Sequence, residues 1–191
     1  IRNLPKRSYG IAGQHDLPGH RIDQVHRSAF CTLVEAGKLI PLERDLPVEI
    51  ADPVPMRLHG FNWNEEIHPF EDLHDMLLEV AVVHAYVWVK GKGYTGADPK
   101  SRYKNLKERF AGYDTVIIGD NHQQWELSGP PFIWNNGVFV RRRSDEIDFR
   151  PRVGLLYSDG TVKPHYLDIS KDKFSASVSS DTVEEVPEGL E

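Results

Sequence analysis

The sequence is poor in cysteine and has no long uncharged apolar run. Its one cysteine, Cys31, cannot form an internal disulfide. No stretch approaches the roughly 20 apolar residues that a membrane-spanning helix needs. The residues after Ile1 also lack the charged, apolar and small-residue regions of a secretory signal. These absences predict a cytoplasmic protein with no membrane partner.

An excess of positive charge is also missing. The formal net charge is −6, which argues against a protein that coats nucleic acid by bulk electrostatic attraction. Basic side chains nevertheless cluster in two places, and each cluster alone is most simply a solvated surface. The first cluster, in residues 90–109 with Tyr94 and Tyr103 interleaved, contains Lys90, Lys92, Lys100, Arg102, Lys104, Lys107 and Arg109. The second contains Arg141, Arg142, Arg143, Arg150 and Arg152.

The remaining composition is that of an ordinary globular domain. The chain has 191 residues, of which 39% are hydrophobic and 27% charged, enough for one domain with a core. Beyond Ser170 the sequence becomes polar, and from Asp181 it carries acids without lysine or arginine. We therefore expect a domain over 1–169 and an acidic, flexible tail over 170–191.

Apolar runs that end in polar loops predict an α/β fold. Buried strands are expected at 9–13, 77–89 and 115–119. One helix is expected to run from an N-cap at Asp23 to a stop at Gly37 and to cover a sheet face. A second helix is expected at about 100–111. Because strand, helix and strand imply a parallel crossover, strands 77–89 and 115–119 should be parallel.

Other segments favour shorter elements. The prolines of 41–70 predict edge strands and loops. Alternating patterns at 132–140 and 152–157, the Asp159-Gly160 turn and residues 161–167 predict antiparallel strands and a hairpin.

Three polar sets follow or end the expected buried strands. They are Gln14-His15-Asp16, His84 and Asp120-Asn121-His122. In α/β folds such loops meet at the carboxyl edge of the sheet, where ligands bind, and amide, imidazole and carboxylate groups all bind divalent metals. Taken singly, His84 is more often a hydrogen-bonded core histidine, and Asp120-Asn121 is compatible with a simple turn.

Taken in order between about Tyr9 and Leu167, these segments resemble the calcineurin-like metallophosphoesterases. Where that family has G-N-H-D/E, a lone histidine after a buried strand, and G-H-x-H, this chain has GQHD, VVH and GDNH. A later region is similar to the N-P-G-S segment and closing strands of SbcD-like DNA repair exonucleases, with WNNGVFVRRRSDE and then PRVGLLYSDGTVKPHYL. The resemblance implies a metallophosphoesterase-type β-sandwich flanked by helices.

The resemblance also implies roles for individual residues. Gln14, in place of the family's asparagine, would bind the second of two divalent metals together with His84 and Asp120. His122 would bind the first metal. His15, oriented by Asp16, would stabilise the transition state or protonate the leaving oxygen. The implied activity is a metal-dependent phosphodiesterase, a DNA nuclease of repair or recombination that uses a two-metal activated water.

Departures from the family pattern change two expectations. Asp120 replaces an imidazole with a harder oxygen ligand, which favours Mn²⁺ or Mg²⁺ over Zn²⁺. The opening motifs D-x-H and G-D-x-x-D do not precede Tyr9, so the domain is expected to be incomplete at its N-terminus and inactive on its own. Either the upstream motifs lie outside this chain, or a second polypeptide provides them, or the site is dead.

The basic clusters supply the expected partner contacts. The segment 90–109 directly follows His84, so its lysines, arginines and tyrosines are expected beside the metals, where they would hold a phosphate backbone and stack bases. The residues expected to bind DNA are Lys90, Lys92, Lys100, Arg102, Arg141 and Arg142. The resemblance implies an SbcC-like ATPase or an upstream half as a protein partner. Two alternatives stay open. The first is a phosphomonoesterase of the same superfamily, and the second is a non-catalytic binding or assembly subunit that retains the fold.

Overall fold

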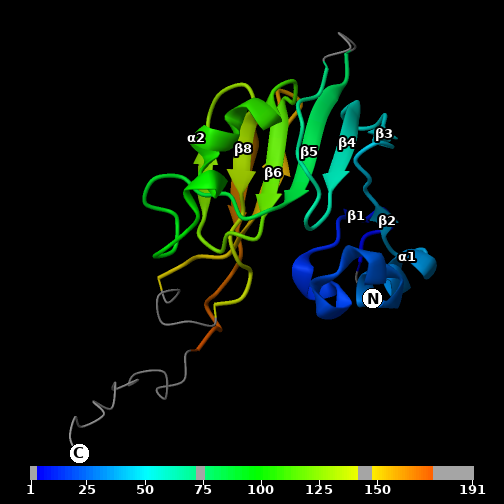
Figure 1. Ribbon diagram of the computed structural model, residues 1–191, viewed down its shortest axis with the longest axis horizontal. Coiled ribbons are helices and arrows are strands. Elements are labelled where there is room, and N and C mark those ends of the chain that lie inside the picture. Colours follow the sequence, from blue (N-terminus) through cyan, green and yellow to red (C-terminus); the bar gives the residue numbers. More distant parts are fainter. Residues whose placement is uncertain (1–3, 72–75, 142–147, 174–191) are drawn as a thin grey trace, which may run out of the picture.

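The computed structural model describes residues 4–71, 76–141 and 148–173, and its centre is a six-stranded mixed sheet with the order β3-β4-β5-β6-β8-β7 (Figure 1). The four inner strands are parallel, and β3 and β7 pair antiparallel at the two edges. The strands are β3 (Val48–Ile50), β4 (Met56–Phe61), β5 (Leu78–His84), β6 (Thr115–Gly119), β7 (Trp125–Leu127) and β8 (Phe132–Asn135). The α/β class predicted from the sequence is therefore confirmed.

The predicted parallel crossover from β5 to β6 is confirmed, but its helix is interrupted. Instead of one helix over 100–111, three short pieces occur, η4 (Pro99–Ser101), α2 (Tyr103–Leu106) and η5 (Lys107–Phe110). Between η4 and α2, Arg102 has extended dihedral angles and pairs with Trp88 as an isolated β-bridge. This bridge prevents the helical turns from joining. No helix in the described part of the chain is long and apolar enough to cross a membrane.

The N-terminal segment lies beside the sheet rather than inside it (Figure 1). The expected strand 9–13 is reduced to β1 (Tyr9–Gly10), which pairs in parallel with β2 (Ile40–Pro41) in a separate two-stranded sheet. Short helical turns follow at η1 (Gln14–Asp16), η2 (Pro18–His20) and η3 (Ile22–Arg27), and then α1 (Ala29–Glu35). The prediction of a long buried strand here was wrong, because β1 finds a partner for only two residues.

The first predicted helix starts later than expected. Ser28, and not Asp23, is the N-cap of α1, and its Oγ accepts a hydrogen bond from Cys31 N at 3.0 Å. The carboxylate of Asp23 is instead bonded to Arg21 at 2.6 Å. Gly37 ends the helix as predicted, with a φ of 64°. No residue of α1 is fully buried, so the expectation that this helix covers a sheet face was wrong.

Two strand predictions after residue 40 also need correction. The region 41–70 was expected to hold edge strands, yet β4 lies between β3 and β5 and is buried along most of its length. The region 132–140 was expected to be antiparallel, but β8 ends at Asn135 and runs parallel to β6. Only its pairing with β7 is antiparallel. The prolines of 41–70 favoured edge strands and loops, so the central position of β4 was not predicted. Period-two alternation predicts a strand but does not indicate whether it pairs in parallel or antiparallel.

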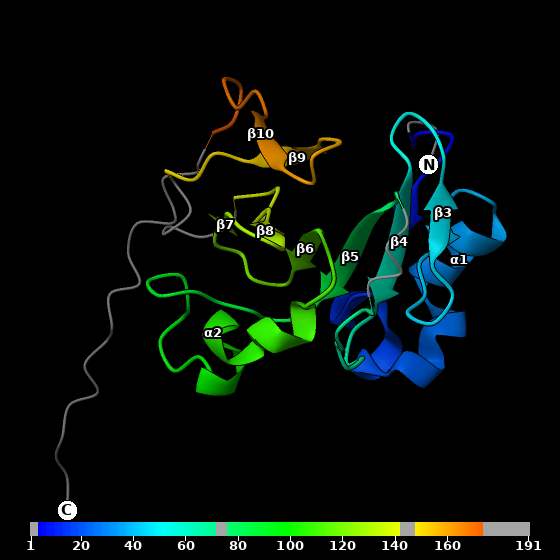
Figure 2. The same cartoon turned by 90° about the horizontal axis from the view of Figure 1, so that it is seen from above.

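The predicted C-terminal hairpin is confirmed. It consists of β9 (Arg152–Leu156) and β10 (Val162–Tyr166), paired antiparallel around the Asp159-Gly160 turn. Thr115 Oγ1 donates to Gly160 O at 2.6 Å and ties the turn to β6. Seen from above, the hairpin lies on one side of the sheet and α2 on the other (Figure 2). Of the predicted acidic tail, residues 174–191 lie outside the described part of the chain.

The two faces of the sheet have separate apolar cores. On the α2 face, Phe110 and Tyr113 pack against side chains of β4, β5, β6 and β8 such as Val83 and Ile118. On the other face, Leu42, Leu58 and Val80 are buried together with partly buried residues of β1 and β9. Gly60 allows Leu42 to pack closely against β4, because a Cβ at position 60 would lie 2.4 Å from Leu42 Cβ.

A charged cluster is buried near the amino ends of β4 and β5. Arg57 Nη1 donates to Glu79 Oε1, and His59 Nε2 lies 2.7 Å from Glu79 Oε2. The three side chains are less than 10% exposed. Burial and the negative charge of Glu79 raise the pKa of the nearby Tyr113 hydroxyl to about 12. Because buried charges cost free energy unless they are paired, each member of the cluster depends on the others.

We expect Glu79→Gln to lower the free energy of unfolding by about 3–5 kcal/mol, because the substitution leaves Arg57 buried without its main counter-charge. Urea unfolding monitored by tryptophan fluorescence measures the change. The matched control is Glu49→Gln, since Glu49 is 68% exposed and contacts the same arginine at 3.4 Å. The control should cost less than about 1 kcal/mol. Equal losses in the two variants would contradict this account.

Candidate functional site

Three side chains from distant parts of the sequence converge at the carboxyl edge of the sheet. His84 ends β5, Asp120 directly follows β6, and Gln14 lies in η1. His84 Nε2 is 2.7 Å from Gln14 Oε1, and Gln14 Nε2 donates to Asp120 Oδ1 at 2.9 Å. His84 Nε2 and Asp120 Oδ1 are 4.0 Å apart. The structure therefore brings together the three residues that the sequence had placed around one predicted metal.

Strand register explains the proximity of His84 and Asp120. In the parallel pairing of β5 with β6, His84 lies opposite Gly119, so the next residue, Asp120, reaches the same edge. Asp120 has a φ of 80°, a left-handed conformation that aspartate tolerates better than most residues. This backbone turn ends the strand directly at the site.

Backbone hydrogen bonds hold the Gln14 loop in place. Ala12 N donates to Asn62 Oδ1 at 2.8 Å, and Trp63 N donates to Ala12 O at 2.8 Å. These bonds join the loop to the chain after β4. A Cβ at Gly13 would lie 2.7 Å from the His84 ring, so only glycine allows the loop to approach the imidazole this closely.

The electrostatics of the cluster favour a neutral imidazole. Desolvation lowers the pKa of His84 below its ordinary value of 6.5, although the charges of Asp120 and Asp16 act in the opposite direction. With the Gln14 carbonyl oxygen facing it, Nε2 carries the proton and donates it. The 4.0 Å contact between His84 and Asp120 is therefore not an ion pair at neutral pH.

The donor atoms are compatible with one divalent cation. Two ligand atoms at about 2.1 Å from a metal lie at most about 4.2 Å apart, and His84 Nε2 and Asp120 Oδ1 are within this limit. An ion there would require the His84 proton to move to Nδ1. Within the described ranges, no group of three or more His, Cys, Asp or Glu side chains has metal-binding geometry. The Gln14 amide is thus needed as a third ligand.

His15 and Asp16 lie near the cluster but make separate contacts. Both influence the pKa of His84 through their charges. Asp16 Oδ2 accepts a hydrogen bond from Gly13 N at 2.9 Å, while the exposed ring of His15 packs edge-on against His20 at 5.4 Å. The Asp16 carboxylate therefore fixes the backbone of its own loop in this structure, whereas the sequence-based hypothesis has it orienting His15.

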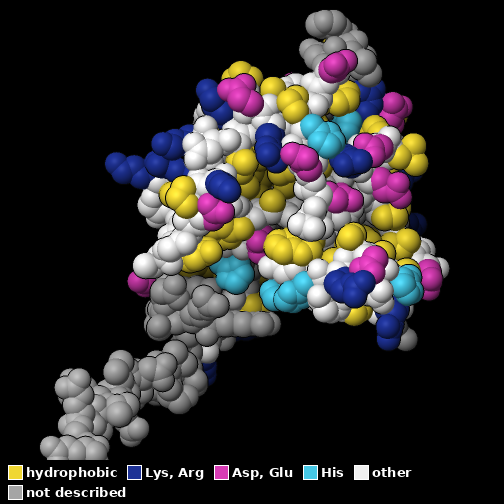
Figure 3. All heavy atoms as spheres, in the orientation of Figure 1, with side chains coloured by type: hydrophobic (Ala, Val, Ile, Leu, Met, Phe, Trp, Pro, Cys, Tyr) yellow, Lys and Arg dark blue, Asp and Glu magenta, His cyan; other side chains and the backbone are white. Residues whose placement is uncertain are grey.

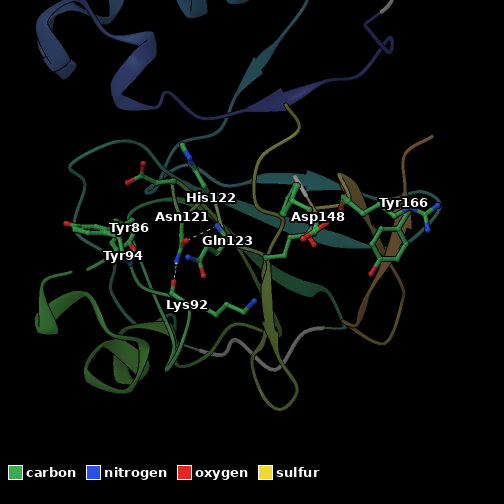
Figure 4. A pocket seen from close by; sticks show the side chains of 12 residues that line it. Tyr86, Lys92, Tyr94, Asn121, His122, Gln123, Asp148 and Tyr166 are labelled. Atoms are coloured by element: carbon green, nitrogen blue, oxygen red, sulfur yellow. Dashed lines mark hydrogen bonds between the residues drawn. The ribbon is translucent and has the colours of Figure 1, made fainter. Parts of the chain in front are cut away.

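A cavity of about 1010 Å³ opens beside the cluster, and Asp120 belongs to both. Its wall includes His122, the predicted ligand of the first metal, together with aromatic and basic side chains from three segments (Figure 4). The lining residues are Tyr86, Lys92, Tyr94, Asp120, Asn121, His122, Gln123, Gln124, Asp148, Phe149, Arg150 and Tyr166.

Asn121 organises the loops around this cavity. Its side chain is buried, and its Nδ2 donates to Val87 O and Lys92 O, both at 2.9 Å. Its Oδ1 accepts from Gln123 N at 3.0 Å. The dashed lines of Figure 4 show how the amide joins the loop after β6 to the basic loop after β5. Lys92 and Tyr94 therefore line the same cavity as Asp120 and His122.

The predicted nucleic-acid-binding residues have different surroundings. Lys90, Lys92 and Lys100 are exposed, and lysine and arginine side chains project outward on the α2 side of the molecule (Figure 3). The guanidinium of Arg102 instead covers the Trp88 ring at 5.3 Å. Arg141 is mostly buried and forms an ion pair with Asp172 at 2.9 Å. The remaining predicted residue, Arg142, lies outside the described residues.

Some residues of the site were not predicted from the sequence. The Trp63 ring meets His84 edge-on at 6.0 Å, and Tyr86, Arg150 and Tyr166 line the cavity. Tyr86 follows His84 at the strand-like spacing of two, which was a signal present in the sequence. No local pattern marks Trp63 or Tyr166, because their positions depend on how distant segments pack.

No protein-family profile matches the chain, and no curated protein sequence matches it with significance.

The lowered pKa of His84 predicts a pH-dependent stability. Between that pKa and 6.5 the unfolded state binds more protons than the folded state, so the free energy of unfolding should fall as the pH drops through this window. Urea unfolding at pH 7.5 and pH 5, with chelator present, measures the fall. His84→Gln should reduce it, while the exposed His26→Gln should not. Equal pH dependence in all three proteins would rule out His84 as a source.

Proposed function

We propose that this chain supplies metal-binding residues of a metal-dependent phosphodiesterase that acts on DNA. The observation that carries the proposal is the convergence of Gln14, His84 and Asp120, within hydrogen-bonding distance, at the carboxyl edge of parallel strands. This edge is where ligands bind in α/β sheets. Asp120 of this cluster also lines a cavity of about 1010 Å³, which is large enough for an extended substrate.

The side chains define which part of the metal chemistry this chain supplies. Gln14, His84 and Asp120 would hold one divalent ion, for which the oxygen ligands favour Mn²⁺ or Mg²⁺. His122, in the cavity wall, would bind a second ion. When bound, such ions polarise a phosphoryl oxygen and lower the pKa of water. The exposed imidazole of His15 would give a proton to the leaving oxygen.

The surroundings of the cluster favour DNA over a small phosphomonoester. A monoester would fill only a small part of the 1010 Å³ cavity, whose wall includes tyrosines and cationic side chains. Lys92 reaches this wall because Asn121 bonds its carbonyl oxygen. Exposed lysines near a phosphate-cleaving site position a nucleic-acid backbone.

A second candidate is a non-catalytic binding or assembly subunit that retains the fold. It is favoured by the way in which the Gln14 amide satisfies both His84 and Asp120 by hydrogen bonds. Side chains that are hydrogen-bonded to one another in this way need no ion to satisfy these atoms. The two candidates differ in whether the cluster binds a metal.

The proposal predicts that the purified full chain binds Mn²⁺ and that His84→Ala and Asp120→Ala each weaken this binding at least tenfold. Both substitutions remove a direct ligand. His15→Ala should leave Mn²⁺ affinity within about twofold, because His15 acts on the substrate and not on the ion. Isothermal titration calorimetry measures the affinities, and His26→Ala is the control. Equal losses in all variants would refute the assignment, and no Mn²⁺ binding by the unaltered chain would favour the non-catalytic subunit.

The basic loop predicts a salt-dependent affinity for DNA. Lys90→Ala combined with Lys100→Ala should weaken binding and lower the slope of log K against log salt by about 0.7–0.9 for each phosphate that is no longer neutralised. Fluorescence anisotropy from 50 to 200 mM salt gives the slope. Lys38→Ala, an exposed lysine of the N-terminal segment, is the control. An unchanged slope in the double variant would mean that the loop is only a solvated surface.

A further inference from the structure

The tyrosine side chains that line the cavity are arranged in two groups. Tyr86 and Tyr94 lie together with ring centroids 5.0 Å apart, and Tyr94 N donates to the Tyr86 hydroxyl at 3.1 Å. Tyr166 belongs to β10 and lies on the opposite side of the cavity from this pair in the close-up view (Figure 4). Tyr94 and Tyr166 are 59% and 41% exposed. Large exposed rings that face a cavity are suited to stacking with planar ligands.

Each aromatic group has a cation beside it. The guanidinium of Arg150 lies over the Tyr166 ring at 4.9 Å, and Lys92 lies in the same loop as Tyr94. A ring with a neighbouring cation presents a surface for a base and a charge for its phosphate. Gln123 adds an amide that can donate to and accept from the edge of a base.

The net charge of the lining distinguishes between forms of nucleic acid. The cations Lys92 and Arg150 are balanced by the carboxylates of Asp120 and Asp148. A double helix carries one negative charge per about 1.7 Å of axis and needs an excess of cations. A balanced lining with several exposed rings favours binding through bases, and bases are accessible only where they are unpaired.

The position and size of the cavity fit a short stretch of strand. Its volume of about 1010 Å³ is at the upper end of the range of about 300–1,000 Å³ for sites that enclose a drug-sized ligand. There is therefore room for more than one nucleotide unit. Asp120 belongs both to the cavity wall and to the His84 cluster, so a nucleotide in the cavity has its phosphate next to the proposed metal ligands.

We propose that this cavity holds unpaired nucleotides of a single-stranded nucleic acid, with one base stacked on the Tyr86–Tyr94 pair and another on Tyr166. The inference rests on the proposed function, because it specifies the substrate of that site. It makes Tyr94 and Tyr166 substrate-binding residues that select an unpaired strand. It also predicts that their contribution is insensitive to salt, unlike that of Lys90 and Lys100.

The test uses the full chain, chelator and a fluorescently labelled single-stranded thymidine oligonucleotide. Tyr94→Leu and Tyr166→Leu should each weaken binding by about 5- to 100-fold, the loss expected when one base stack is removed. The salt slope should stay unchanged. Tyr94→Phe and Tyr166→Phe should restore most of the affinity, because stacking needs the ring and not the hydroxyl.

Tyr157→Leu is the matched control. Tyr157 is 42% exposed, a fraction similar to that of Tyr166, and the Lys163 ammonium lies 4.7 Å from its ring centroid. Tyr157 does not line the cavity. It should change affinity less than twofold. An abasic oligonucleotide of the same length and a duplex of the same sequence should bind weakly. The tyrosine substitutions should not change the affinity for either of them. A free thymidine monophosphate should compete only weakly, since it occupies one of the two aromatic groups.

The inference is overturned if Tyr157→Leu matches the cavity variants, if abasic and normal strands bind equally, or if the duplex binds better than the single strand. Efficient competition by the mononucleotide would assign the cavity to a free nucleotide instead. These outcomes are independent of Mn²⁺ titration, in which the proposed metal site itself succeeds or fails. Tyrosine-dependent strand binding without Mn²⁺ binding would therefore disprove the proposed function and retain a single-strand binding cavity.

Discussion

The parallel pairing of β5 with β6 determines where the candidate functional side chains lie. Opposite pairing of His84 and Gly119 brings His84 and Asp120 to the same edge of the sheet, and Asp120 turns the chain away with a positive φ. The Gln14 amide then links these two side chains to the N-terminal segment. If the register of β5 and β6 were shifted by one residue, His84 would point to the other face and the cluster would not form.

Strand β5 carries ionisable side chains near both ends, and their surroundings differ. Near its beginning, Glu79 is bonded to Arg57 and His59 and is almost fully enclosed. Its bonds to two side chains of β4 stabilise one arrangement of β4 and β5. At its end, His84 is 23% exposed and has a neutral amide as its bonded partner. Desolvation keeps its imidazole neutral at physiological pH, which is the form that binds metals.

Asn121 connects the cluster with the cavity. Its side-chain amide donates to two carbonyl oxygens of the preceding loop and accepts from one backbone N–H of its own loop. The amide is therefore engaged within the protein. Asn121 is thus a positioning residue. The combination of tyrosines, two cations and two carboxylates around the cavity is consistent with a ligand bound by its flat apolar surfaces more than by its charge.

The elements with strong local signals could be predicted from the sequence. The predictions included β5, β6, their parallel crossover and the Asp159-Gly160 hairpin. Such buried strands and tight turns are determined largely by residues that are adjacent in the sequence. The convergence of Gln14, His84 and Asp120 was predicted in the same way, from polar residues at strand ends. Tertiary packing was needed to place β4 inside the sheet, because the buried guanidinium of Arg57 is paired there with Glu79. It alone also decided that Tyr166 faces Tyr94 across a cavity, because the proximity of residues so far apart in the sequence depends on packing, which has no local signature.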